Sequence, residues 1–119
     1  MDERILKWLY DVRFCIEEIE SFFVGEEKNF HLYQQNIMRK RAVERNLEII
    51  GEAINRIITR DKTYTIKVEN AKSIIGLRNH VIHAYDSVSD ENIWSILLNH
   101  LPKLKTGVDT LIEEFENKL

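Results

Sequence analysis

The chain has 119 residues, of which 44% are hydrophobic and 31% charged, and its formal net charge is −3. This length suits one domain, residues 1–119, with one core, and the composition excludes a disordered chain. No apolar run could cross a bilayer, the charged N-terminus does not resemble a secretory signal, and the single cysteine, Cys15, excludes an internal disulfide. We therefore expect a cytoplasmic protein with no membrane partner. The net negative charge argues against a protein that coats nucleic acid non-specifically.

The scarcity of helix breakers, one proline and four glycines, is typical of long helices. Apolar residues at spacings of four and three predict a first helix over residues 2–24, which Gly25 would end. A second helix is predicted from about residue 29 to residue 58, and its length makes it the spine of the fold. The alternating stretch 63–68 is predicted to be an extended loop, because a single strand would have no partner.

A third helix is predicted over residues 70–83 and a fourth over residues 90–115. Ser89 is expected to cap the fourth helix, and Asp90 and Glu91 would place negative charge in its first turn. Pro102 removes a backbone hydrogen bond and clashes with the preceding turn, so we expect a kink or a break there. The predicted fold is an all-α antiparallel four-helix bundle, with the fourth helix kinked or broken near Pro102.

The end of the third predicted helix carries the most reactive side chains of the chain, within residues 78–85. Arg78 could hold phosphate oxygens, and His83, with an unperturbed imidazole pKa near ~6.5, could move a proton. Asn79 could orient the imidazole or the phosphate. Positions five apart on an ideal helix differ by about 140°, so Arg78 and His83 share a ligand only if the helix frays or they approach it from opposite sides.

One histidine does not conveniently serve as both acid and base in a single turnover. A symmetric dimer that pairs two copies of this helix end would supply two imidazoles and two guanidinium groups to one cleft. We therefore expect a homodimer, in which Ile75, Ile82 and Trp94 could form the interface. The common alternative for an arginine and a histidine on a helix is a surface cation and a packed imidazole.

A basic run in residues 39–45 could guide RNA to this site, although a solvated helix face or a docking surface for an acidic partner explains it equally well. The run contains Arg39, Lys40, Arg41 and Arg45. His80 lies three residues before His83, but two nitrogens without nearby carboxylates make a poor metal site. We expect His80 to face solvent or RNA, and no metal or other cofactor is predicted. Cys15 lies on an apolar stripe and is expected in the core.

The motif Arg-x₄-His-x-Tyr, from Arg78 to Tyr85 with Asn79 after the arginine, resembles the HEPN superfamily and, within it, the HepT toxin branch. The stretch 45–53, the residues 75–77 that lead into the motif and the Leu101-Pro102-x-Leu104 sequence also resemble that branch, so the similarity covers essentially the whole chain. It implies an all-helical dimer and a metal-independent endoribonuclease with Arg78, Asn79 and His83 at the active site. Attack by the ribose 2′-hydroxyl would leave a cyclic phosphate.

The resemblance also implies a type VII toxin–antitoxin system whose antitoxin is a minimal nucleotidyltransferase of the MntA type. In that family the antitoxin transfers AMP from ATP to the motif tyrosine, which here is Tyr85. A phosphodiester at this position would occupy the anion site and repel RNA. The chain departs from many relatives at residues 68–70, where they carry Pro-Trp. Two other readings stay open: a non-catalytic helical subunit that presents substrate to a nucleotidyltransferase, and a nucleotide-binding helical domain. The RNA target, tRNA or mRNA, is not specified.

Overall fold

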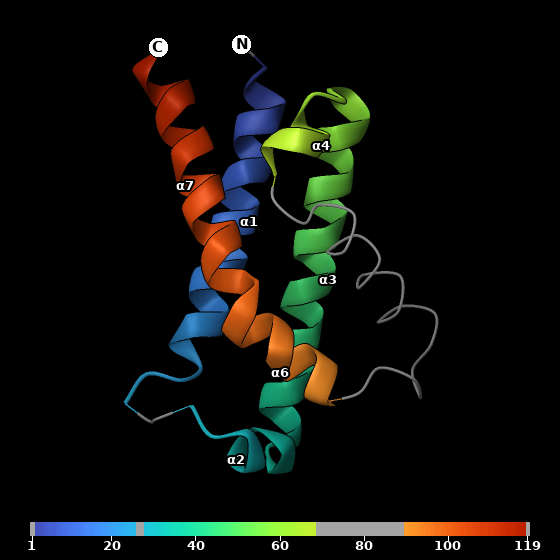
Figure 1. The fold of residues 1–119 in the computed structure, drawn as a ribbon, viewed down its shortest axis with the longest axis vertical. Helices are drawn as coiled ribbons and strands as arrows, with labels where there is room; N and C mark the ends of the chain where they lie inside the picture. Colours follow the sequence, from blue (N-terminus) through green and yellow to red (C-terminus); the bar gives the residue numbers. More distant parts are fainter. Residues whose placement is uncertain (1, 26–27, 69–89, 119) are drawn as a thin grey trace.

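The computed structural model describes residues 2–25, 28–68 and 90–118, and every regular element within these ranges is a helix (Figure 1). The helices are α1 (Glu3–Ser21), α2 (Phe30–Gln35), α3 (Ile37–Arg60), α4 (Tyr64–Lys67), α6 (Asp90–Asn99) and α7 (Leu101–Asn117). The predicted all-α fold class is therefore confirmed. The predicted third helix and the Ser89 cap lie outside the described residues. No helix in the described ranges is long and apolar enough to cross a membrane.

The body of the fold is formed by α1, α3 and α7, and α1 packs mainly against α3 and next against α7 (Figure 1). Each of the three helices contributes an apolar face whose residues recur three or four positions apart, as an amphipathic helix requires. The largest fully buried side chains include Leu9, Val12 and Ile16 of α1, Leu47, Ile50, Ile54 and Ile57 of α3, and Val108 and Ile112 of α7.

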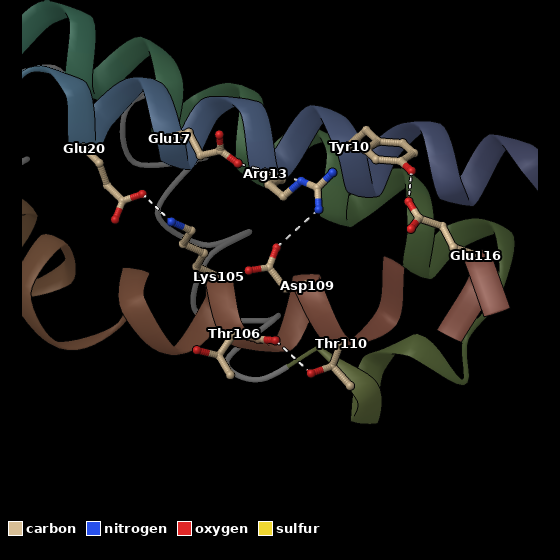
Figure 2. Close-up of polar contacts among 9 residues, drawn as sticks. All are labelled: Tyr10, Arg13, Glu17, Glu20, Lys105, Thr106, Asp109, Thr110 and Glu116. Atoms are coloured by element: carbon tan, nitrogen blue, oxygen red, sulfur yellow. Dashed lines mark hydrogen bonds and ion pairs between the residues drawn. The ribbon is translucent and has the colours of Figure 1, made fainter. Parts of the chain in front are cut away.

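Polar contacts along the edge of the core show that α1 and α7 run antiparallel (Figure 2). In the first half of α1, the Tyr10 hydroxyl donates a hydrogen bond to Glu116 near the end of α7. Near the end of α1, Glu20 accepts from Lys105 in the first half of α7, with 2.8 Å between the oxygen and the nitrogen. These pairs lie outside the apolar contact, so they help to specify register more than they add stability.

The second predicted helix is wrong as one continuous element, because the chain breaks at Asn36 between α2 and α3. Asn36 has an extended backbone, with φ −94° and ψ 90°, and its side-chain oxygen accepts a hydrogen bond from the Arg39 backbone N–H at 3.0 Å. Asparagine caps a helix N-terminus well, since its short side chain satisfies a backbone donor that the helix leaves unpaired. The α3 helix also ends at Arg60, slightly beyond the predicted boundary.

The predicted extended loop at residues 63–68 is also wrong, since residues Tyr64–Lys67 form the short helix α4. Tyr64 and Val68, four residues apart, are both buried, so their spacing is helical although the local sequence also alternates. Asp61 starts this turn, because its Oδ1 accepts hydrogen bonds from the backbone and the hydroxyl of Thr63 at 3.0 and 2.7 Å.

The predicted interruption near Pro102 is confirmed, because α6 ends at Asn99, α7 begins at Leu101 and His100 separates them. Pro102 lies at the start of α7, where its missing N–H removes no helical hydrogen bond. The proline therefore begins a new helix instead of distorting an existing one. This break lets α6 leave the direction of α7 and cross toward α2 and the first half of α3 (Figure 1).

Candidate functional site

The Arg-x₄-His-x-Tyr motif lies between α4 and α6, outside the residues that the structure describes. The roles of its members therefore stay predictions. The structure does describe both flanks of this segment, which are Val68 at the end of α4 and Asp90 at the start of α6. The predicted site residues outside the described ranges are Arg78, Asn79, His80, His83 and Tyr85.

The C-terminal flank of the segment is held to α3 by an ion pair. The Nζ atom of Lys40 lies 2.9 Å from Oδ2 of Asp90, and the two side chains are only 23% and 18% exposed. Asp90 is the first residue of α6, where the positive end of the helix dipole also favours a carboxylate. Limited contact with water makes this pair stronger than a fully exposed one. Nothing in the sequence predicted that these two residues meet.

An aromatic cluster holds the next turn of α6. The ring of Trp94 lies against those of Phe23, Phe30 and Tyr33, with centroid distances of 5.9, 5.8 and 5.2 Å. These rings come from the end of the α1 segment and from α2, so the cluster joins three parts of the chain. Trp94, predicted as a core or interface residue, is partly buried in this cluster and packs against the core.

The first two members of the basic run take part in packing. The guanidinium of Arg39 lies 4.7 Å from the ring centroid of Phe23 and donates a hydrogen bond to the carbonyl oxygen of Phe22 at 3.3 Å. The cation thereby connects α3 to the end of α1. Lys40 is engaged by Asp90, as described above. The positive charges of Arg39 and Lys40 are thus both engaged by other residues of the fold.

The other two members lie on the outer surface of α3. The side chains of Arg41 and Arg45 are 76% and 63% exposed. They are four residues apart, so they project from the same face of the helix. Each pairs with a glutamate three residues further on, Glu44 at 3.2 Å and Glu48 at 3.1 Å. Such pairs are easily exchanged for a phosphate contact, because exposed ion pairs contribute little free energy.

Tyr33 is a fully buried residue of α2 whose hydroxyl has no hydrogen-bond partner among the described residues. Burial, followed by the carboxylates of Glu44 and Asp90, raises the pKa of this phenol well above its ordinary value. The hydroxyl therefore stays protonated at physiological pH. An unpaired buried hydroxyl costs stability, since water no longer satisfies it.

Tyr33→Phe is expected to raise the free energy of unfolding by about 1 kcal/mol, because it removes the unpaired hydroxyl and keeps the ring. Urea unfolding followed by circular dichroism measures the change. Tyr10→Phe is the matched control and should change stability in the opposite direction, because the Tyr10 hydroxyl donates to Glu116. A Tyr33→Phe variant that is less stable than the parent would contradict this account.

A buried amide on α3 was not predicted as important. Asn46 is buried, and its side-chain nitrogen donates to Oε1 of Glu18 at 3.2 Å and to the Ala42 carbonyl at 2.9 Å. These bonds satisfy the amide nitrogen, and the bond to Glu18 joins α3 to α1. One feature of the sequence could have indicated its importance, because Asn46 interrupts the apolar face of α3 between Val43 and Leu47.

The described ranges hold no group of three or more histidine, cysteine or acidic side chains that could bind a metal ion. Cys15 is a buried free thiol, and burial raises its pKa to about 11. Burial therefore disfavours the thiolate form that a nucleophilic cysteine needs. The prediction that Cys15 belongs to the core is confirmed.

The fold and the motif together define a class of protein, a small HEPN-like helical domain with an Arg-x₄-His sequence between two of its helices. The family model described as "Ribonuclease HepT-like" matches residues 13–111, which include the motif and most of the described helices. The chain belongs to the HepT-like ribonuclease family.

Curated relatives extend this similarity over nearly the whole chain. The candidate RNase MJ0125 of Methanocaldococcus jannaschii is 30% identical over 99% of this chain and 100% of its own length. The candidate RNase MJ1380 of the same organism is 34% identical over 92% of this chain and 98% of its own length. The candidate RNase TTE0752 of Caldanaerobacter subterraneus subsp. tengcongensis is 29% identical over 89% of this chain and 88% of its own length. No solved structure matches the chain at comparable significance.

Proposed function

We propose that this chain is a metal-independent endoribonuclease toxin whose active site contains Arg78, Asn79 and His83. The observation that carries the proposal is the Arg-x₄-His motif itself, which lies within the segment that the HepT-like ribonuclease family model matches. The names of the curated relatives, all candidate RNases, support the same activity. The substrate is therefore RNA and the reaction is cleavage of its phosphodiester backbone.

The side chains of the motif supply the chemistry that such cleavage needs. The His83 imidazole accepts the proton of a ribose 2′-hydroxyl, and the freed oxygen attacks the neighbouring phosphorus. The bond from phosphorus to the 5′-oxygen then breaks, and an imidazolium returns a proton to that oxygen. The products are a 2′,3′-cyclic phosphate and a 5′-hydroxyl end. Arg78 stabilises the negative charge that builds on the phosphoryl oxygens, while Asn79 orients the phosphate or the imidazole.

A homodimer supplies the second imidazole that this mechanism uses. One His83 serves as the base while the His83 of a second copy serves as the acid, so two chains share one cleft. The same arrangement brings two Arg78 guanidinium groups to one phosphate. Sedimentation or light scattering on the purified chain measures its oligomeric state. A monomer that cleaves RNA would exclude the shared cleft.

Purified protein tests the proposed activity. Incubation with tRNA and with mRNA in the presence of EDTA is expected to produce fragments that end in a 2′,3′-cyclic phosphate. Cleavage that stops when EDTA is added would contradict the metal-independent mechanism. Comparing tRNA with mRNA also identifies the preferred substrate.

Arg41 and Arg45 are proposed to contact RNA phosphates, because they are the members of the basic run that project from the surface. Replacing both with alanine is expected to reduce the slope of log K against log salt for single-stranded RNA by about 1.4. The control variant Arg56→Ala/Lys103→Ala removes two exposed positive charges elsewhere and should leave the slope nearly unchanged. Equal slopes for the two double variants would assign RNA binding to another surface.

Neutralisation is proposed to occur by AMP transfer to Tyr85 from a partner nucleotidyltransferase of the MntA type. The transferred group would place a negative phosphodiester two residues from His83, where it competes with RNA for the cationic site. The test is co-expression with a nucleotidyltransferase encoded next to this chain, followed by mass spectrometry of the Tyr85 peptide. The Tyr85→Phe variant should acquire no AMP and should remain active beside the partner.

The second candidate is a non-catalytic helical subunit that binds a nucleotidyltransferase and presents its substrate. The net charge of −3, together with the glutamate partners of both exposed arginines, favours this function over RNA binding. Expression of the chain without a partner separates the two candidates. Growth arrest that His83→Ala abolishes supports the toxin, whereas normal growth combined with a stable nucleotidyltransferase complex supports the subunit.

A further inference from the structure

The start of α6 is fixed by contacts with three other parts of the fold. Asp90 is paired with Lys40 of α3, and Trp94, one helical turn later, packs against Phe23, Phe30 and Tyr33. An apolar contact and an ionic contact therefore act on adjacent turns of one helix. The aromatic rings fix where α6 lies, and the ion pair additionally fixes its first residue.

The ion pair is better shielded from water than a comparable pair elsewhere in the described part of the chain. Lys40 and Asp90 are 23% and 18% exposed, whereas Lys105 and Glu20 are 35% and 48% exposed at a nearly equal separation of 2.8 Å. Screening by solvent and salt is weaker where exposure is lower. The Lys40–Asp90 contact can therefore hold a defined geometry, while the Lys105–Glu20 contact on the α1–α7 edge serves as its natural control (Figure 2).

Chain connectivity places this anchor close to the motif. Asp90 follows Tyr85 by five residues and His83 by seven. A fully extended chain spans about 3.6 Å per residue, so Tyr85 stays within about 18 Å of Asp90 and His83 within about 25 Å. A shift at Asp90 is a shift at one end of the short stretch of chain that leads from the motif to α6. Catalysis is sensitive to such shifts, since a displacement of about 1 Å can cost about 100-fold in rate.

We propose that Lys40 and Asp90 are positioning residues for RNA cleavage: their ion pair fixes the point at which the motif-bearing segment joins α6. The inference rests on the proposed function and adds to it two residues that touch no substrate. It also gives Lys40 a role different from that of Arg41 and Arg45. Lys40 acts through Asp90 on the geometry of the motif, so its loss affects turnover and leaves RNA binding intact.

Steady-state kinetics on the full chain tests this role. Lys40→Met keeps the aliphatic stem and removes the charge, and it is expected to lower kcat by about tenfold while KM for RNA stays within about twofold. Lys105→Met removes the charge of the control pair and should leave kcat within about twofold. Lys40→Arg preserves a cation at this position and should retain at least about half of the parental kcat.

A double-mutant cycle shows whether the two residues act as one unit. Asp90→Asn is expected to lower kcat about as much as Lys40→Met does, and the double variant should be no slower than either single variant. Effects that multiply in the double variant would mean that the residues act separately, and this would overturn the proposal. Thermal melting of every variant, compared with Lys105→Met, separates loss of turnover from loss of folded protein.

The failure of this proposal differs from the failure of the proposed function. If Arg78→Ala abolishes cleavage while Lys40→Met and Asp90→Asn cleave at the parental rate, the positioning role is wrong and the nuclease stands. If the parent chain cuts no RNA, hydrogen exchange at residues 78–85 supplies the readout. Exchange should then be faster in Lys40→Met than in Lys105→Met, and equal exchange in the two variants would overturn the proposal.

Discussion

His83→Ala is expected to slow RNA cleavage by about 10²- to 10⁴-fold, because it removes the group that accepts and returns the proton. Initial rates on a labelled RNA, measured in EDTA, give the ratio directly. The substitution changes one side chain, so circular dichroism should show the parental helix content. In cells, the same variant should abolish growth arrest when the chain is expressed without a partner.

The matched control is His31→Ala, which removes an exposed imidazole from α2 and should cleave at the parental rate. Arg78→Lys is informative in a different way, because it keeps the charge but loses the planar fork that holds two phosphate oxygens. We expect this variant to be strongly impaired. If His83→Ala cleaves RNA as fast as His31→Ala does, the catalytic assignment is wrong.

Ile50→Ala is expected to lower the free energy of unfolding by about 2–5 kcal/mol, the largest effect on stability among the changes considered. Ile50 is fully buried in the middle of α3, the longest described helix. Truncation removes apolar contacts and leaves a cavity that the surrounding side chains fill only in part. Urea unfolding monitored by circular dichroism measures the loss.

Ile66→Ala makes the same chemical change at a side chain that is 90% exposed on α4. Its effect on the free energy of unfolding should stay within about 0.5 kcal/mol. The difference between the two variants isolates the contribution of burial from that of composition and helix propensity. Similar losses in both would show that α3 does not supply the centre of the core.

Local sequence was sufficient to predict the elements whose structure depends mainly on neighbouring residues. The apolar spacing of α1 and α3 and the interruption near Pro102 both follow from backbone geometry and amphipathic periodicity. Asn36 was missed because asparagine is tolerated inside a helix as well as at its cap, and helical patterns flank it on both sides. The α4 turn was missed because Tyr64 and Val68 fit a helical spacing and an alternating one equally well.

The candidate site shows the same division. The motif from Arg78 to Tyr85 stands out within the sequence because its members are close neighbours. The Lys40–Asp90 pair is formed across 50 positions, and it depends on the angle at which α6 crosses α3, which the break at His100 between α6 and α7 makes possible. No local pattern contains that angle. The basic run was likewise predicted as one unit, whereas the rotation of α3 turns Arg39 toward Phe23 and leaves Arg41 outside.

The two ends of the described chain lie at the end of the molecule opposite α2 (Figure 1). Asp2 and Lys118 line the same surface cavity, together with Tyr64 of α4. A purification tag, a dye or a fused protein attached at either end would therefore leave the first half of α3 and the start of α6 unobstructed. A short peptide could also join both ends, so a circularly permuted chain with new ends in the connection before α2 is a practical route to relocating a label.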